Sequence, residues 1–371
     1  MKKTFDEVFI DNTKLGTKVP TSEYSDAGKY IIVDQGQSQI AGYTDKEQGV
    51  FKDVPVIIFG DHTRVIKYVD RPFFLGADGT KVLKSKFKNA NYKYLFYALK
   101  NVRIQNTGYS RHFKWLKMIS INYPSLLIQS NIAVVLDTLA YIIECKQREL
   151  ELYDELIKAR FVEMFGDARK NPNKYDTVSF IDIVEYMGDI GSNGANKVVV
   201  DHLDMKDKED YAMMVRFTNF TKNDFTDDVK YVSKEAYDFF KKSQIFGGEL
   251  IICKIGSAGQ NYVMPYLNRP VSLGLNQIMV RIKDNILMPY LYQYLHTDYG
   301  EFLISGCING AVTKTITKTE LKKIPVMLPP MELQREFVAF VEQVDKSKAV
   351  IEKSLKELET LQASLMQKYF S

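Results

Sequence analysis

The clearest pattern in the sequence is a hydrophobic repeat with alternating spacings of four and three residues, which occurs twice. One copy lies in residues 124–169 and the other in residues 329–371. An average spacing of 3.5 residues over roughly four heptads is typical of the buried seam of a coiled coil. The apolar and aromatic seam positions are Ile132, Leu136, Leu139, Ile143, Leu150, Tyr153, Ile157, Met164, Phe337, Val341, Val344, Ile351, Leu355, Leu358, Leu365 and Tyr369.

The two copies of this pattern align with each other without a gap. Residues 116–165 align with residues 321–370, so that Gln129 corresponds to Gln334 and Phe165 to Phe370. Each copy follows a short β-like stretch and a proline, and proline is tolerated only in the first turn of a helix. We therefore expect two long helices that begin just after the prolines and pair antiparallel. Two unrelated amphipathic helices, each packed on its own domain, are the alternative.

The segments between the helices indicate two β-rich globules. Short apolar runs bounded by turn residues are typical of strands, and they occur at 30–34, 54–63, 249–260 and 276–282. A tyrosine-rich stretch with helical spacing lies near the end of each globule, at 92–100 and 289–304. The predicted fold class is α+β, with an internal pseudo-two-fold repeat. The predicted domains are globules at 1–123 and 170–328 and coiled-coil helices at 124–169 and 329–371.

An antiparallel helix pair has consequences for the placement of the globules. Each globule is then expected at the start of its own helix, and the last residue is expected to return to the first globule. Dimeric DNA-binding proteins place two reading modules one or more turns of DNA apart, about 34–36 Å per turn. The repeat therefore predicts that this single polypeptide contains two such reading modules, arranged as in a dimer.

Composition excludes several classes of protein. The chain has 371 residues, of which 45% are hydrophobic and 26% charged, unlike a disordered chain. Its three cysteines form no CxxC pair, which favours a reducing cytoplasm and argues against a cysteine zinc site. A net charge of +4 is compatible with a nucleic-acid partner. Because 18 consecutive apolar residues occur nowhere in the sequence, we expect a cytoplasmic protein without a membrane span.

The sequence contains no motif that indicates catalysis. The Pro329–Pro330 pair follows Leu328, so it does not match the Asn/Asp-Pro-Pro-aromatic motif of an adenine methyltransferase. The glycine-rich stretches 188–194 and 255–260 match neither a dinucleotide fingerprint nor a P-loop. The four histidines lack metal-ligand spacing. We therefore expect no catalytic residue and no metal site in this chain.

Three segments resemble a known family, the specificity subunits of Type I restriction-modification systems. Residues 59–83 resemble part of its target-recognition domains, residues 163–172 the end of its central helix, and residues 328–345 the start of its distal helix. The central copy departs from the family at Tyr123–Pro124, where Pro-Pro is usual, and lacks the acid before Gln129. The departure affects the local contacts expected of the central helix.

The resemblance implies a DNA-reading subunit that does no chemistry itself. Each globule would read one half of a bipartite double-stranded DNA target, and the helices would set the spacing between the halves. The helices would also dock two methyltransferase subunits, which use S-adenosylmethionine to methylate adenine. Motor-nuclease subunits would use ATP and Mg²⁺ for restriction. The alternatives are a protein-binding coiled-coil scaffold, an orphan subunit without specific DNA recognition, and a self-contained enzyme.

Candidate DNA-contacting residues are polar or basic residues on glycine-containing loops. Base edges are read mainly by Arg, Lys, Asn, Gln, Ser and Thr, although ordinary exposed turns have a similar composition. Segments 106–114 and 309–318 hold nearly equivalent places before the two long helices. In the first globule the candidates are Gln35, Gln37, Ser38, Gln39, His62, Arg64, Lys81, Tyr109, Ser110, Arg111 and Lys114. In the second globule they are Ser192, Asn193, Asn196, Lys197, Asn276, Gln277, Asn309, Thr313 and Lys314.

Overall fold

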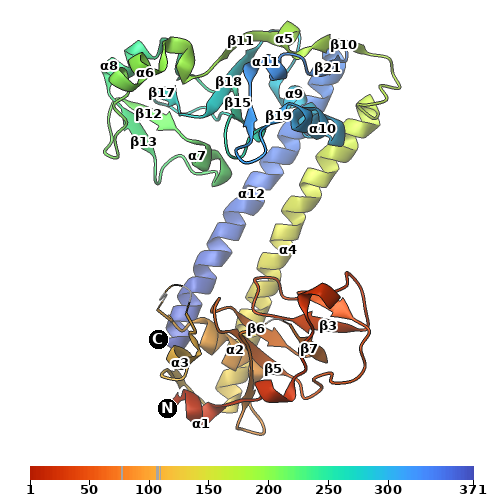
Figure 1. Cartoon of the computed structure of the whole chain (residues 1–371), viewed down its shortest axis with the longest axis vertical. Helices are drawn as coiled ribbons and strands as arrows, with labels where there is room; N and C mark the ends of the chain where they lie inside the picture. Colours follow the sequence, from red (N-terminus) through yellow and green to blue (C-terminus); the bar gives the residue numbers. More distant parts are fainter. Residues whose placement is uncertain (77, 106–107, 109) are drawn as a thin grey trace. The chain divides into compact units, whose positions relative to one another are not determined.

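The computed structural model describes residues 1–76, 78–105, 108 and 110–371, and it divides into two compact units (Figure 1). The first unit comprises Met1–Glu149 and Ile351–Ser371, and the second comprises Leu150–Val350. Each unit therefore combines one globule with part of both long helices, α4 (Leu126–Phe165) and α12 (Met331–Phe370).

The first globule is built on two small sheets. The four-stranded antiparallel sheet has the order β2 (Phe9–Asp11), β8 (Thr80–Ser85), β5 (Val56–Gly60), β6 (Ile66–Val69). The three-stranded sheet has the order β4 (Gly42–Thr44), β3 (Tyr30–Val33), β7 (Phe73–Leu75), with β3 parallel to β7. A third pairing joins β1 (Lys2–Thr4) to β9 (Ser120–Asn122). The helices of this globule are α1 (Phe5–Val8), α2 (Tyr92–Lys100) and α3 (Phe113–Leu116).

The second globule repeats this plan with additions. Its main antiparallel sheet has the order β11 (Val184–Gly188), β18 (Gln277–Ile282), β15 (Leu250–Cys253), β16 (Asn261–Val263). The next sheet has the order β13 (Lys230–Val232), β12 (Ala212–Val215), β17 (Val271–Leu273), β14 (Gln244–Ile245). Two-stranded pairings join β10 (Asp176–Ser179) to β21 (Pro325–Leu328) and β19 (Ile308–Asn309) to β20 (Thr315–Ile316). The helices are α5 (Phe180–Ile183), α6 (Asn196–His202), α7 (Phe217–Thr221), α8 (Lys234–Phe239), α9 (Met288–Leu295), α10 (Asp298–Gly306) and α11 (Lys318–Leu321).

The same contacts recur at corresponding places in the two globules. In the first, the hydroxyl of Tyr94 on α2 donates to the Asn122 carbonyl at 2.7 Å. In the second, the hydroxyl of Tyr290 on α9 donates to the Met327 carbonyl at 2.9 Å. Burial raises the pKa of both phenols, to about 12 for Tyr94. The tyrosine-rich helices therefore hold the strand that precedes each long helix.

One predicted helix is divided in two by the structure. The tyrosine-rich stretch 92–100 forms α2 over its whole length, but the stretch 289–304 forms α9 and α10. The chain turns at Thr297, whose side chain accepts from the Gly300 N–H at 3.1 Å and so begins a second helix. A Cβ at Gly300 would lie 2.3 Å from the Tyr294 carbonyl, so a larger residue there would not fit this turn.

Within each unit, parts of α4 and α12 lie side by side and run in opposite directions. In the second unit, Arg160 pairs with Glu336 at 2.9 Å, and Lys348 pairs with Asp154 at 2.6 Å. In the first unit, Ile132 and Leu136 of α4 share one hydrophobic cluster with four residues of α12, namely Leu365, Met366, Tyr369 and Phe370. The last residue also reaches the first globule, because the amide of Asn122 donates to the Ser371 carbonyl at 3.2 Å.

The residues at the predicted seam positions are all shielded from solvent to some degree. Ile132, Leu136, Leu139, Ile143, Ile157, Phe337, Val341, Val344 and Ile351 are buried, and Leu150, Tyr153, Met164, Leu355, Leu358, Leu365 and Tyr369 are half-buried. The heptad spacing therefore identifies the inward face of each helix segment.

Helix α4 also carries a strongly apolar outer face. An 18-residue window of α4 has a mean hydropathy of 1.8, but only 28% of that window is buried. By length and composition alone such a helix could cross a membrane, although core helices of other proteins pass the same test. Its exposed residues include Leu127, Val134 and Tyr141, with exposed fractions of 73%, 64% and 66%. A surface of this kind is typical of an interaction site.

Candidate nucleic-acid interface

The four candidate loops of the first globule meet at one edge of its sheets. Gln35 lies at their centre: its amide nitrogen donates to the Asp78 carbonyl at 2.7 Å, and its amide oxygen accepts from the His62 N–H at 3.1 Å. The Thr63 hydroxyl donates to the Gln35 carbonyl at 2.6 Å. Gln35 thus joins the loop after β3, the turn after β5 and the turn before β8.

The segment before α3 joins the same edge through Asp61. The buried Asp61 carboxylate accepts from the Phe113 N–H at 2.7 Å, and its carbonyl accepts from the His112 N–H at 2.8 Å. The ring of His112 is fully buried beside that carbonyl. Segments 34–39, 61–64, 78–81 and 110–114 therefore form one continuous surface, the first recognition edge.

Close packing at this edge depends on a glycine. Gly79 has a φ of +87°, a conformation that L side chains rarely adopt. A Cβ at this position would lie 2.8 Å from the His62 ring and 2.9 Å from the Gln35 amide. The turn can approach its neighbours only without a side chain.

Several candidates of the first globule have internal partners. Gln35 and His62 bond to neighbouring loops, and the Gln39 amide donates to the Tyr68 carbonyl at 2.7 Å. Lys81 lies 3.7 Å from Asp11 and 5.0 Å from the centre of the Phe113 ring. Exposed candidates are Gln37, Ser38, Arg111 and Lys114, while Arg64 and Ser110 are half-buried. Tyr109 lies outside the described residues.

The second globule has a recognition edge built around a buried charge. Asp189, whose side chain is 9% exposed, accepts from Lys254 at 2.8 Å, Lys318 at 2.9 Å and the Ser192 hydroxyl at 2.9 Å. Burial alone would raise the pKa of this carboxyl, but the hydrogen bonds from Lys254, Lys318 and Ser192 outweigh it and lower the pKa to about 2.

Lys254 brings the remaining candidate segments of the second globule together. Its N–H donates to the Asn276 carbonyl at 2.7 Å, and its carbonyl accepts from the Ile316 N–H at 3.0 Å. The next turn joins as well, because the Gly256 N–H donates to the Lys314 carbonyl at 3.3 Å. The second recognition edge therefore consists of segments 189–197, 254–260, 274–277 and 309–318, which include the glycine-rich stretch 255–260 and most of the stretch 188–194.

The candidates of the second globule divide into internal and exposed residues. Ser192 bonds to Asp189, and Asn193 donates to the Ser243 hydroxyl at 2.7 Å. Gln277 is 1% exposed and accepts from the Gly274 N–H. The exposed candidates are Asn196, Lys197, Asn276, Asn309, Thr313 and Lys314.

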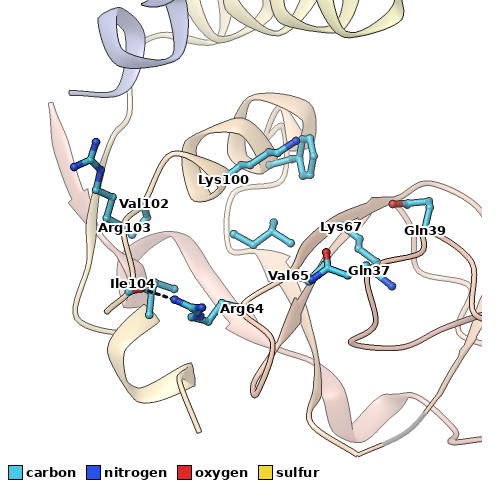
Figure 2. Close-up of a pocket in the computed structure, with 11 residues that line it drawn as sticks. Gln37, Gln39, Arg64, Val65, Lys67, Lys100, Val102, Arg103 and Ile104 are labelled. Carbon is cyan, nitrogen blue, oxygen red and sulfur yellow. Dashed lines mark hydrogen bonds between the residues drawn. The ribbon is translucent and has the colours of Figure 1, made fainter. Parts of the chain in front are cut away.

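A basic pocket beside the first edge contains three cations that the sequence reasoning missed (Figure 2). This cavity of about 600 Å³ is lined by Arg64 of the first edge and by Lys67, Lys100 and Arg103. Gln37 and Gln39 also line it. The missed cations come from β6, from the end of α2 and from the segment after α2. No local motif marks them, because only the packing of α2 beside β6 brings them together.

The corresponding place in the second globule has a different charge. A cavity of about 380 Å³ lies between the start of β16, the end of α9 and α10. Its charged or titratable lining residues are Glu301, His296 and Tyr262, and no Lys or Arg lines it. Burial lowers the pKa of His296, which favours the neutral ring. Helix α10 supplies Glu301, and the first globule has no helix at the corresponding place, between α2 and α3, in its described residues.

In the part of the chain that the structure describes, no three His, Cys, Asp or Glu side chains cluster in a way that could hold a metal ion. The polar groups of both edges are instead suited to hydrogen bonding with bases and phosphates.

Comparison with known proteins identifies the family. The model of the Type I restriction modification DNA specificity domain matches residues 1–152 and 183–360. The specificity subunit of the Type I restriction enzyme EcoR124I/EcoR124II from Escherichia coli is 23% identical over 348 residues, which cover 88% of this chain and 82% of that protein.

Solved structures show the same fold. The S subunit of a Type I restriction-modification system from M. genitalium has a TM-score of 0.61 at 17% identity, covering 100% of this chain and 96% of its own. A structure described as concerning complex assembly and conformational transition of the type I R-M system has a TM-score of 0.51 at 15% identity, covering 100% of this chain and 97% of that chain. This chain therefore belongs to the Type I restriction-modification DNA specificity family, as the sequence resemblance predicted.

Proposed function

We propose that each recognition edge binds one half of a bipartite double-stranded DNA target. The observation that carries this proposal is the convergence of separate polar loops at one edge in each unit, around Gln35 in the first and Asp189 in the second. The hydrogen-bonded residues hold the loops, and the exposed candidates beside them contact the bases and phosphates. Direct reading of base edges needs side chains held in this way.

The two long helices serve as the spacer in this proposal. They form an antiparallel coiled coil in which a pseudo-two-fold axis relates one helix to the other. The length of this coiled coil sets the distance between the two half-sites. The seam burial and the Arg160–Glu336 and Lys348–Asp154 pairs support this. A two-fold arrangement places the modified adenines on opposite DNA strands, one in each half-site.

The exposed apolar face of α4 is the proposed docking surface for the methyltransferase subunits. Its most exposed members in the first unit are Leu127, Val134 and Tyr141, and in the second unit Val162 is 54% exposed. Burying such residues against a protein partner is favourable by roughly 25 cal/mol per Å² of apolar area. The exposed glutamates of α12 disfavour DNA contact there, and they include Glu342, Glu352 and Glu359.

Chemistry is assigned to the partners in this proposal. Methyltransferase subunits bind S-adenosylmethionine, and motor-nuclease subunits bind ATP and Mg²⁺. This chain supplies the choice of DNA sequence and the assembly surface, and it carries no catalytic residue.

The proposal is tested by sequencing the methylated positions in the genome of a host with and without this gene, expressed beside the neighbouring methyltransferase gene. The expected result is a split motif, methylated on adenine in both halves, that disappears with the gene. If no motif depends on the gene, the chain is an orphan subunit or a scaffold. Capture of the methyltransferase by the purified chain then separates those two.

A further inference from the structure

Three of the four cations that line the basic pocket of the first unit have no acidic partner in the described part of the chain. Arg64, Lys100 and Arg103 line it, and among the described residues none of the three forms an ion pair. Within the residues that the structure describes, the Arg64 guanidinium has one partner, the Ile104 carbonyl at 3.2 Å, and its Nε is buried without a partner. Figure 2 shows this arginine at the side of the pocket near Ile104. The cavity is therefore strongly attractive to an anion.

A fourth cation, Lys67, has a different role at the pocket. It is 2% exposed, lies 3.5 Å from Asp34, and donates to the Ser38 carbonyl at 2.5 Å. Lys67 thus fixes the loop that carries Gln37 and Gln39, and both glutamines line the pocket. Any anion held by Arg64, Lys100 and Arg103 lies next to the side chains of the first recognition edge.

The second unit shows that this charge is not a general property of the fold. Its corresponding cavity is lined by Glu301 and by His296, whose pKa is lowered by burial, and by no Lys or Arg. Two lysines of the second edge, Lys254 and Lys318, are paired with Asp189. The basic pocket is thus a special feature of the first unit.

We propose that the basic pocket binds a backbone phosphate of the DNA half-site read by the first unit, an inference that rests on the proposed function. A phosphodiester carries the negative charge that three unneutralised cations attract, and Arg and Lys are the usual phosphate partners in DNA complexes. A phosphate at this site would position the neighbouring bases against Gln37 and Gln39. A free nucleotide offers the same phosphate chemistry and is distinguished by the test.

The test compares variants of the full chain assembled with its methyltransferase subunits on a duplex that carries the methylated split motif. The variant K100Q/R103Q removes two exposed cations, and among the described residues neither side chain has a hydrogen bond to lose, although the Lys100 ammonium lies 5.6 Å from the centre of the Phe96 ring. The matched control, K52Q/K88Q, removes two exposed lysines of the same unit that do not line the pocket. Affinity is measured against salt concentration.

The plot of log affinity against log salt has a negative slope, and its magnitude is expected to fall by about 1 for K100Q/R103Q, because the contact to one phosphate is lost. The control is expected to keep the wild-type slope, and both variants are expected to keep the sequence preference. R64Q is a second variant, with an expected fall of at most about 1 in the magnitude of the slope, and its melting temperature shows whether it folds.

Three outcomes would overturn the inference. If the wild-type assembly binds its motif and K100Q/R103Q has the wild-type slope, the pocket holds no phosphate, while the proposed function stands. If the wild-type assembly has no preference for any split motif, the proposed function fails, and the inference fails with it. If AMP saturates the free chain and K100Q/R103Q abolishes that binding, the pocket is a site for a free nucleotide.

Discussion

The two recognition edges occupy the same place on the same scaffold, but they are held together by different interactions. In the first unit an uncharged side chain, Gln35, joins three loops by hydrogen bonds. In the second unit a buried carboxylate, Asp189, is held by two lysines and a serine. The cavities beside the edges also differ, with four cations in one and Glu301 in the other.

The scaffold contacts, in contrast, are repeated almost unchanged. The main sheets of the two globules have corresponding strand orders. The second sheet of each globule contains one parallel pair, β3 with β7 in the first globule and β12 with β17 in the second. Tyr94 and Tyr290 make the same hydrogen bond to the strand before the long helix. The interactions that hold the edge loops therefore differ between the two units, while the scaffold that carries these loops is the same.

The largest expected effect of a single change is at Asp189. The variant D189N leaves Lys254 and Lys318 beside a neutral amide, so the free energy of unfolding of the second unit should fall by roughly 2–3 kcal/mol at neutral pH. Because the folded pKa of about 2 lies below the unfolded value of about 3.9, this stabilisation is present above about pH 5 and is lost as the pH falls toward 2.

Urea unfolding of wild type and D189N at several pH values measures this effect. The two stabilities should converge as the pH falls, and a constant difference between pH 7 and pH 2 would contradict the assignment. The matched change in the first unit, Q35A, should show no such pH dependence, because Gln35 does not titrate.

The next effect compares Gln334 with Gln129, which correspond in the repeat. Both are fully buried, and both donate at 2.9 Å to the carbonyl of a proline, Pro329 or Pro124. Gln334 also accepts from the Leu287 N–H at 2.9 Å, whereas the amide oxygen of Gln129 has no partner among the described residues. Q334A should therefore destabilise the protein by about 1 kcal/mol more than Q129A, since it leaves one further half-buried donor, the Leu287 N–H, without its partner. Equal losses in chemical unfolding would refute the distinction.

A smaller effect is expected at the two tyrosines of the shared frame. Y94F and Y290F each remove one hydrogen bond to a backbone carbonyl, which costs about 0.5–1.5 kcal/mol. Thermal unfolding should show losses of similar size. A loss confined to one variant would show that the frame is less symmetric than its hydrogen bonds indicate.

The smallest effect concerns the cavity of the second unit. E301K places a cation where the first unit has several, so it should raise the salt slope of DNA binding by at most about 1. The control E235K makes the same change in the first turn of α8, another short helix. If both variants change the slope equally, the cavity has no special position relative to DNA.

The parts of the fold that local periodicity encodes could be predicted from the sequence. The heptad spacing identified both long helices, and the tyrosine spacing identified α2 over its whole length. The break between α9 and α10 was missed because it depends on a side-chain cap at Thr297 and on close packing at Gly300.

For the candidate segments, the sequence indicated which loops are polar but not which of their side chains have internal partners. The chosen loops do meet, but Gln35 and Asn193 bond within the protein, to residues far away in the sequence. The cations Lys67, Lys100 and Arg103 were missed for the same reason, because they approach one another only when α2 packs beside β6. Long-range packing decides which polar side chains remain free to contact DNA. A local sequence pattern contains no information about that packing.

The central claim, that each edge reads its own half of the target, is tested most directly by methylation sequencing of edge variants. The variant Q37A/R111A changes exposed residues of the first edge, and T313A/K314A changes exposed residues of the second. The account predicts that each variant relaxes the sequence of one half of the methylated motif, a different half in each case, and leaves the other half intact. A variant that alters both halves together, or a pair that alters the same half, would contradict it.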